Sequence, residues 1–171
     1  MNEILALIAG LLAVGLYIAG YQIKKRSGII LCNASSRFFY IAQYLLLGAF
    51  EGAIMDLLGL FASLPARWKE QPQIKRFLPL ILAVIYLPIL IAGILLYENF
   101  FSLFALFGVL LETGALWFSK ERQIRLVSLL SAPCWLIYNL SEGAWGSVIG
   151  NTLAIASLLL AIYRYDRKKE T

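Results

Sequence analysis

The sequence contains no histidine, two cysteines and few charged side chains, and each shortage argues against a class of function. Without histidine the chain lacks the commonest general base and a common ligand of zinc and haem. Cys32 and Cys134 form no metal-binding spacing and no disulfide framework. No glycine-rich loop that could cradle a phosphate is present. We therefore expect no enzyme activity, no catalytic residues, no cofactor and no metal site.

Polar residues are too scarce to cover a soluble domain. Charged residues make up 15% of the 171 positions and hydrophobic residues 61%, with a mean hydropathy of +0.78. A soluble domain of this length would need a polar surface around its core. Instead, apolar runs long enough to cross a hydrocarbon core of about 30 Å recur along the whole chain. The sequence predicts an all-α, multi-pass membrane protein whose immediate surroundings are the lipid bilayer.

The polar loops divide the chain into seven predicted transmembrane spans of about 17–21 residues. They are Ile4–Gln22, Gly28–Gly48, Gly52–Trp68, Phe77–Tyr97, Phe100–Phe118, Gln123–Leu140 and Gly146–Tyr163.

The charges between these spans predict the orientation. Apart from Arg37, the basic residues fall in the odd-numbered loops and the tail: Lys24 to Arg26, Arg67, Lys69, Lys75, Arg76, Lys120, Arg122, Arg125, Arg164 and Arg167 to Lys169. The amino end and the even-numbered loops carry acids, namely Glu3, Glu51, Glu98 and Glu142. The positive-inside rule then places the N-terminus outside and the C-terminus in the cytoplasm. The net charge of +5 needs no nucleic-acid partner, because a basic rim suits anionic lipid head groups.

An internal repeat relates the two halves of the sequence. Gly48-Ala49-Phe50 matches Gly143-Ala144-Trp145 at a shift of 95 residues, and the same shift pairs Tyr40 with Trp135, Gln43 with Tyr138, and Asp56 with Asn151. We therefore predict a 3+1+3 arrangement: a triple-helix bundle over residues 1–68, a linker and fourth helix over 69–97, and a second bundle with a basic tail over 98–171. One linking helix gives both units the same orientation, a parallel repeat. A duplicated scaffold without a pathway remains the alternative.

Three ionisable residues lie at membrane depth, where such side chains are costly unless they are paired or face water. The helical rise places Arg37 about 14 Å from the cytoplasmic edge of its span and Glu112 about 18 Å below the outer edge. Asp56 lies nearer that outer edge, at a depth of about 6–8 Å. Depth therefore favours an Arg37–Glu112 ion pair over an Arg37–Asp56 pair. Such a pair either locks two spans together or lines a permeation path.

Polar and aromatic residues share one face of the second span in each repeat. In the first repeat this face carries Asn33, Arg37, Tyr40 and Tyr44, and in the second Ser128, Ala132, Trp135 and Asn139. An aromatic ring beside an amide can hold a small polar ring such as a sugar or nucleoside, although the rings can equally serve helix packing. The predicted substrate-binding residues are Asn151, Asp56, Trp135, Tyr40, Asn139 and Gln43.

The run Trp135-Leu136-Ile137-Tyr138 followed by Asn151 resembles the second-to-third helix segment of the MtN3-like clan, which includes the SWEET, SemiSWEET, PQ-loop and PnuC transporters. Within it, Cys134 to Asn139, then Gly143, and a final helix ending at Arg164 are similar to the YgjV-type bacterial inner membrane proteins. The resemblance implies a SWEET-like fold in the bacterial inner membrane. It also implies that Asn151 and Asp56 contact substrate and that Trp135 and Tyr40 form an aromatic clamp.

The chain departs from the SWEET pattern in two respects. The hinge proline of the first helix is missing, since Tyr21-Gln22 and Leu116-Trp117 stand at the corresponding places. The charged residues Arg37, Asp56 and Glu112 argue against a neutral sugar as cargo. We favour a transporter of a small polar metabolite, with or without ion coupling. The alternative is a non-transporting membrane interaction or assembly protein that reuses the fold. A homo-oligomer is compatible with either.

Overall fold

The computed structural model describes residues 2–166, and those residues form helices and short connections with no strand. The helices are α1 (Asn2–Gln22), α2 (Arg26–Leu47), α3 (Phe50–Ser63), α4 (Pro72–Arg76), α5 (Leu78–Leu95), α6 (Ser102–Leu116), α7 (Glu121–Ser141) and α8 (Trp145–Ala161). A 3₁₀ helix (Leu64–Trp68) follows α3 directly, and a π-helical turn (Ile162–Asp166) follows α8. The predicted all-α class is confirmed.

Among the described residues, four segments are long and apolar enough to cross a membrane: Asn2–Gln22, Leu78–Leu95, Glu121–Ser141 and Trp145–Asp166. The predicted spans on α2, α3 and α6 do not reach that standard. α2 has 22 residues but carries many polar side chains, whereas α3 and α6 have 14 and 15 residues. Fourteen residues of α-helix extend about 21 Å, less than a hydrocarbon core of about 30 Å. These three helices carry the buried ionisable side chains Arg37, Asp56 and Glu112.

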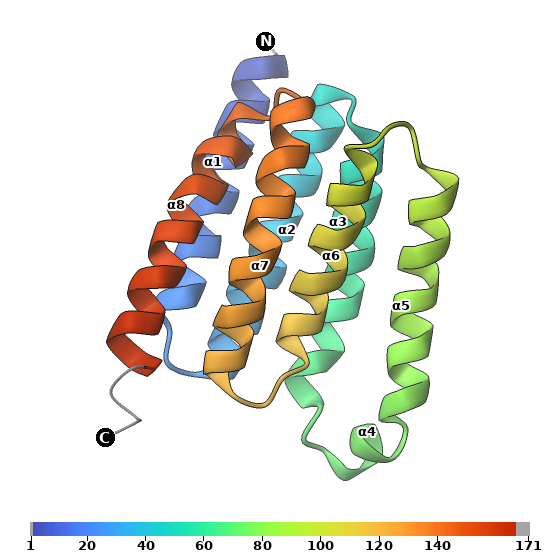
Figure 1. Cartoon of the computed structure of the whole chain (residues 1–171), viewed down its shortest axis with the longest axis vertical. Helices are drawn as coiled ribbons and strands as arrows, with labels where there is room; N and C mark the ends of the chain where they lie inside the picture. Colours follow the sequence, from blue (N-terminus) through green and yellow to red (C-terminus); the bar gives the residue numbers. More distant parts are fainter. Residues whose placement is uncertain (1, 167–171) are drawn as a thin grey trace.

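The long helices stand side by side in two rows of three, with α5 at one edge (Figure 1). α2 packs between α1 and α3 in one row, and α7 packs between α6 and α8 in the other. The rows approach closely at their two edges, through α1 with α8 and through α3 with α6, while α5 contacts α3 and α6. The middle helices α2 and α7 meet mainly through large side chains. Tyr44, for example, stacks on Trp135 with 6.4 Å between ring centroids. Helices α1 to α3 thus form one row and α6 to α8 the other.

Small residues explain why α1 and α8 approach so closely. A Cβ atom on Gly146 would lie 3.1 Å from the Leu7 carbonyl oxygen and 3.2 Å from the Cα of Gly10. On Gly150 it would overlap the side chain of Val14. Glycines at such positions let helix backbones touch inside a membrane. This edge of the two rows is therefore sealed by backbone contact.

The middle helices of both rows end in the same way. Gly48 directly follows α2, and Gly143 lies two residues after the end of α7. Their φ angles are 77° and 64°, in the left-handed region that glycine adopts without strain. The next amides, of Ala49 and Ala144, donate to the carbonyls of Tyr44 and Asn139, both at 3.0 Å. This pattern is a helix-ending motif that satisfies the last free carbonyls. The two motifs lie 95 residues apart, as the predicted repeat requires.

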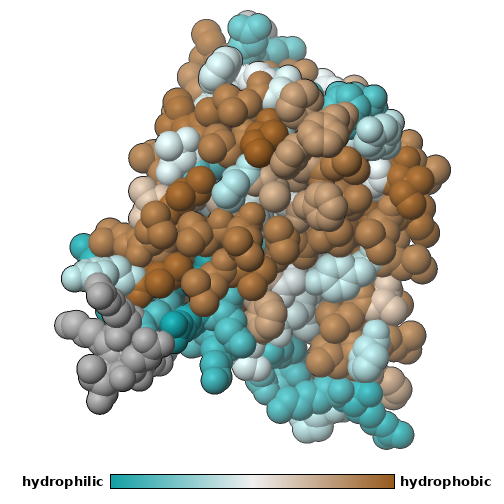
Figure 2. All heavy atoms as spheres, in the orientation of Figure 1, coloured by the Kyte–Doolittle hydropathy of each residue, from teal (hydrophilic) through white to brown (hydrophobic). Residues whose placement is uncertain are grey.

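The surface matches a membrane environment. Figure 2 shows an apolar band over the front helices, with hydrophilic residues gathered at the lower edge. Large apolar side chains on the outer faces are exposed, among them Leu80, Val84 and Ile94 on α5. Polar and charged side chains such as Arg37, Asn33 and Gln43 are instead buried inside the protein. This inside-out distribution is expected when lipid replaces water around the protein.

Candidate functional site

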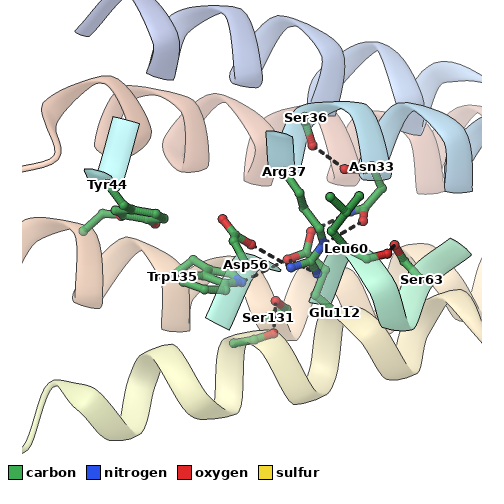
Figure 3. Close-up of polar contacts among 12 residues, drawn as sticks. Asn33, Ser36, Arg37, Tyr44, Asp56, Leu60, Ser63, Glu112, Ser131 and Trp135 are labelled. Atoms are coloured by element: carbon green, nitrogen blue, oxygen red, sulfur yellow. Dashed lines mark hydrogen bonds and ion pairs between the residues drawn. The ribbon is translucent and has the colours of Figure 1, made fainter. Parts of the chain in front are cut away.

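The centre of the protein holds an ionic triad of Arg37, Asp56 and Glu112 (Figure 3). The guanidinium Nη1 of Arg37 lies 2.6 Å from Asp56 Oδ1, and its Nη2 lies 3.1 Å from Glu112 Oε2. The side chain of Arg37 is only 1% exposed. Helices α2, α3 and α6 each contribute one member, so the triad bridges both rows of the fold.

The predicted Arg37–Glu112 ion pair is present, but the preference over Asp56 is wrong, because Arg37 pairs with both carboxylates. The depth estimate used only the rise along each helix and ignored the length of the arginine side chain. The forked guanidinium also presents separate donors to two acceptors. Gly59 also matters, since a Cβ atom there would lie 2.2 Å from Arg37 Nη1. The missing side chain of Gly59 leaves the space that the guanidinium occupies beside α3.

Glu112 is the more fully bonded of the two carboxylates. Its Oε1 accepts a hydrogen bond from Asn33 Nδ2 at 2.7 Å, and its Oε2 accepts one from Trp135 Nε1 at 3.0 Å, in addition to the Arg37 ion pair. Asn33 also accepts a bond from Arg37 Nε at 3.2 Å through its Oδ1. Asp56 accepts a bond from Arg37 through Oδ1, and no described residue donates to its Oδ2. The two acids therefore have different surroundings.

A small cavity of about 10 Å³ adjoins the triad. Its lining residues are Tyr17, Arg37, Tyr40, Tyr44, Asp56, Glu112, Trp135, Asn139 and Asn151. A space of this size is just sufficient for one water molecule. The hydroxyls of Tyr17 and Tyr40 are buried without a hydrogen-bond partner in the described structure, although both residues line this space. The cavity is therefore small, lined by buried side chains and incompletely hydrogen-bonded.

The structure brings most of the predicted binding residues together. Asn151, Asp56, Trp135, Tyr40 and Asn139 all line the central cavity. Trp135 and Tyr40 do not face each other as a clamp, however. Trp135 stacks on Tyr44, and the nearest ring to Tyr40 is that of Tyr17, 6.4 Å away and steeply inclined.

Gln43 lies outside the central cavity. It lines a larger space of about 540 Å³ at the end where α1 begins, together with Glu3, Glu142 and Trp145. We call this space the vestibule. Gln43 Oε1 accepts a short hydrogen bond from the Ser147 hydroxyl, which joins α2 to α8 between the vestibule and the central cavity.

Sequence reasoning missed Tyr17 and Asn33 as central residues. Asn33 was recognised on the polar face of α2, but its bond to Glu112 depends on the approach of α6 from the other row. Tyr17 interrupts a long aliphatic stretch of α1, one helical turn before Tyr21. One signal could have found it: the 95-residue shift pairs Tyr17 with Glu112.

Contacts between the rows follow the same shift. The Tyr138 hydroxyl accepts a bond from the Gly52 amide at 2.9 Å, while Gln43 is bonded to Ser147. Positions 43 and 138 are related by the shift, as are positions 52 and 147. Equivalent backbone positions in the two halves therefore make equivalent contacts, although the side chains differ.

Two arginines make matching contacts at the basic end. Arg26 on α2 donates to the carbonyls of Leu116 and Phe118 at the end of α6, at 2.6 and 2.8 Å. Arg125 on α7 donates to the carbonyls of Tyr21 and Ile23 at the end of α1, at 3.4 and 3.2 Å. The shift relates Tyr21 to Leu116 and Ile23 to Phe118, so both arginines bind equivalent carbonyls of the opposite half.

Each arginine also ties down the third helical segment of its own half. Arg26 donates to the Ala66 carbonyl at 2.7 Å, and Arg125 pairs with Asp166 at 3.0 Å. Lys69 reinforces the first set by donating to the Trp117 carbonyl; burial, followed by the charge of Arg26, lowers the pKa of Lys69. We call these two sets of contacts the arginine clamps. They join helix ends from both halves across the basic end of the protein.

Comparison with known families identifies the chain. A family model described as "Bacterial inner membrane protein" (Imp-YgjV) matches residues 4–169. The chain belongs to the YgjV family of bacterial inner membrane proteins. Membership agrees with the apolar outer surface and with the candidate membrane spans. No curated protein and no solved structure shows significant similarity.

Proposed function

We propose that this YgjV-family protein is a transporter that carries a small polar metabolite between two three-helix repeats. The observation that carries the proposal is the central cavity, which gathers an arginine, two carboxylates, two amides and four aromatic rings inside an inner membrane protein. Ionisable groups at such a depth are costly and usually mark a substrate or ion pathway. The resemblance to the MtN3-like clan and the matching contacts 95 residues apart support the 3+1+3 repeat on which a path between the halves depends.

The proposal assigns the observed conformation to a closed state. A cavity of about 10 Å³ cannot admit a metabolite, so cargo must enter after the halves move apart. On the vestibule side, two hydrogen-bonded contacts, Gln43–Ser147 and Gly52–Tyr138, stand between the halves. On the basic side, the arginine clamps join the two halves. The vestibule would face outward and the clamps the cytoplasm, with the N-terminus outside, as the loop charges predict.

Transport can be tested by reconstituting the purified protein into liposomes and measuring uptake from a panel of labelled sugars, nucleosides, vitamins and amines. Once a ligand is found, Asp56→Ala and Asn151→Ala should each weaken its binding at least tenfold. Unchanged affinity in both variants would show that the central cavity is not the binding site. Leu153→Ala, on the outer face of α8, is the matched control.

A non-transporting interaction or assembly protein is the second candidate. The observation in its favour is that Arg37 pairs with both carboxylates and Glu112 also accepts two hydrogen bonds, as in a static core that locks helices together. Co-purification of a stable partner, with no uptake and no stabilisation by any solute, would support this role.

A further inference from the structure

The central cavity carries an unbalanced charge. Arg37 contributes one positive charge, whereas Asp56 and Glu112 contribute two negative charges when ionised. The surrounding helices supply no further cation. The titratable groups facing the triad are Tyr17 and Tyr21 from α1 and Tyr40 and Tyr44 from α2, and all four are acids.

The remaining neighbours are neutral. α7 presents Trp135 and Asn139, and α8 presents Asn151. Tyr86, the titratable residue of α5, lies beside Gly114. A net buried negative charge in an apolar protein is strongly unfavourable, so the closed structure requires one compensating positive charge.

The groups left unbonded around the cavity are suited to a cation. Asp56 Oδ2 and the hydroxyls of Tyr17 and Tyr40 have oxygen lone pairs without a donor in the described structure. The Asn151 side chain, which also lines the cavity, makes no hydrogen bond there. The rings of Trp135 and Tyr40 add aromatic surface of the kind that attracts cations. An anionic ligand would find donors in the Tyr17 and Tyr40 hydroxyls and in Arg37 Nη2, but it would add a third negative charge to a cavity that holds two carboxylates and one guanidinium.

We propose that the central cavity binds one exchangeable monovalent cation against the Arg37–Asp56–Glu112 triad. This inference rests on the proposed function and deepens it by naming the ligand class. The cation is either a proton or the ammonium group of a small amine. Of these two, only the proton fits a cavity of about 10 Å³, and Asp56 is its site, because Glu112 already accepts two hydrogen bonds in addition to its Arg37 ion pair. An ammonium group enters when the halves open, and Asp56 then releases its proton to water as the carboxylate pairs with the ammonium.

Difference infrared spectroscopy of the purified protein in lipid tests this directly, because a protonated carboxyl and a carboxylate absorb at separate frequencies. The expected wild-type result is one buried protonated carboxyl that ionises as the pH is raised. Asp56→Asn and Glu112→Gln should both abolish this signal, since each leaves one negative charge opposite Arg37. Leu153→Ala, on the outer face of α8, keeps all three charges and leaves the cavity lining intact, so it should retain the signal. Absence of the signal in the wild type, or its persistence in folded Glu112→Gln, would overturn the proposal.

Methylammonium, tetramethylammonium and neutral glycerol then identify the source of the cation. If amines are ligands, methylammonium should remove the carboxyl signal and release one proton per chain, whereas glycerol should not. A signal that responds to pH but to neither amine assigns the site to the proton.

The outcomes separate this inference from the proposed function. If a carboxyl titrates but no solute enters the liposomes, the cation site stands and the transport proposal is wrong. If solute enters the liposomes but no carboxyl titrates, the transport proposal stands and the cation site is wrong.

Discussion

The hydroxyl of Tyr44 donates a 2.6 Å hydrogen bond to Asn139 Oδ1, and the two residues are 95 positions apart. The same 95-residue shift relates the two halves of the sequence. Two equivalent positions can touch each other only where they approach the axis that relates the halves. The Tyr44–Asn139 bond therefore marks the middle of the fold, between α2 and α7, where both residues line the central cavity.

The first prediction concerns the strength of this contact. Tyr44→Phe and Asn139→Ala should each destabilise the protein, and the double variant should cost less than the sum. The expected coupling is about 0.6 kcal/mol, the average for hydrogen bonds between membrane helices, with about 1.7 kcal/mol as the upper limit. Unfolding in mixed micelles would measure it. Tyr97→Phe, at a largely exposed residue, serves as a control and should show no coupling to Asn139→Ala.

The second prediction concerns Gly59. Gly59→Ala should displace the Arg37 guanidinium and destabilise the protein by about 1–3 kcal/mol, because a methyl group must enter a filled space. Gly15→Ala is the matched control, since its Cβ would meet no atom within 4 Å. Helix propensity alone favours alanine over glycine by up to about 1 kcal/mol, so this control should be neutral or stabilising. Equal thermal stability of the two variants would contradict the assigned position of Arg37.

The third prediction concerns the arginine clamps. Arg125→Gln leaves Asp166 buried without its partner, and breaking a buried pair in this way costs about 3–5 kcal/mol. Arg26→Gln should cost less, because Arg26 is partly exposed and binds neutral carbonyls. If the clamps hold the basic end closed, both variants should also make that end more accessible to proteases and water-soluble labels. The exposed Lys25→Gln should change neither property.

The fourth prediction concerns pH and the loop between α7 and α8. Burial, followed by the charge of Glu98, raises the pKa of Glu142 above its usual value. The folded protein therefore holds a proton on Glu142 more tightly than the unfolded chain, and this contribution to stability falls as the pH rises through the raised pKa. Glu142→Gln should make the thermal stability less dependent on pH in that range. A steeper dependence in the variant would show that the sign is wrong.

The sequence predicted several features because they depend on local pattern. The all-α class follows from composition and apolar runs, and α1, α5, α7 and α8 are long and apolar enough to span a membrane. The predicted span Gly52–Trp68 corresponds to α3 together with its 3₁₀ extension. The shared face of Asn33, Arg37, Tyr40 and Tyr44 follows from helical spacing, and all four are buried.

What the sequence could not predict depends on how distant helices meet. The second carboxylate of Arg37 required the close approach of α3 at Gly59. The arginine clamps required helix ends about 90–100 residues away in the chain, and neither Arg26 nor Arg125 stands at the position equivalent to the other. Arg26 and Arg125 were counted as ordinary loop cations, because nothing local distinguishes them from exposed Lys25.

The account depends most on the central cavity opening to water, and cysteine labelling at Asn151 tests this claim. In a variant with Cys32 and Cys134 replaced by alanine, Asn151→Cys places a thiol in the cavity and Leu153→Cys places one on the outer face of the same helix. The thiolate is the nucleophile that attacks a thiol reagent, and it forms in water rather than in lipid. We predict that a membrane-impermeant reagent labels Asn151→Cys but not Leu153→Cys. If folded Asn151→Cys protein is as unreactive as Leu153→Cys, the cavity is a sealed core and not a pathway.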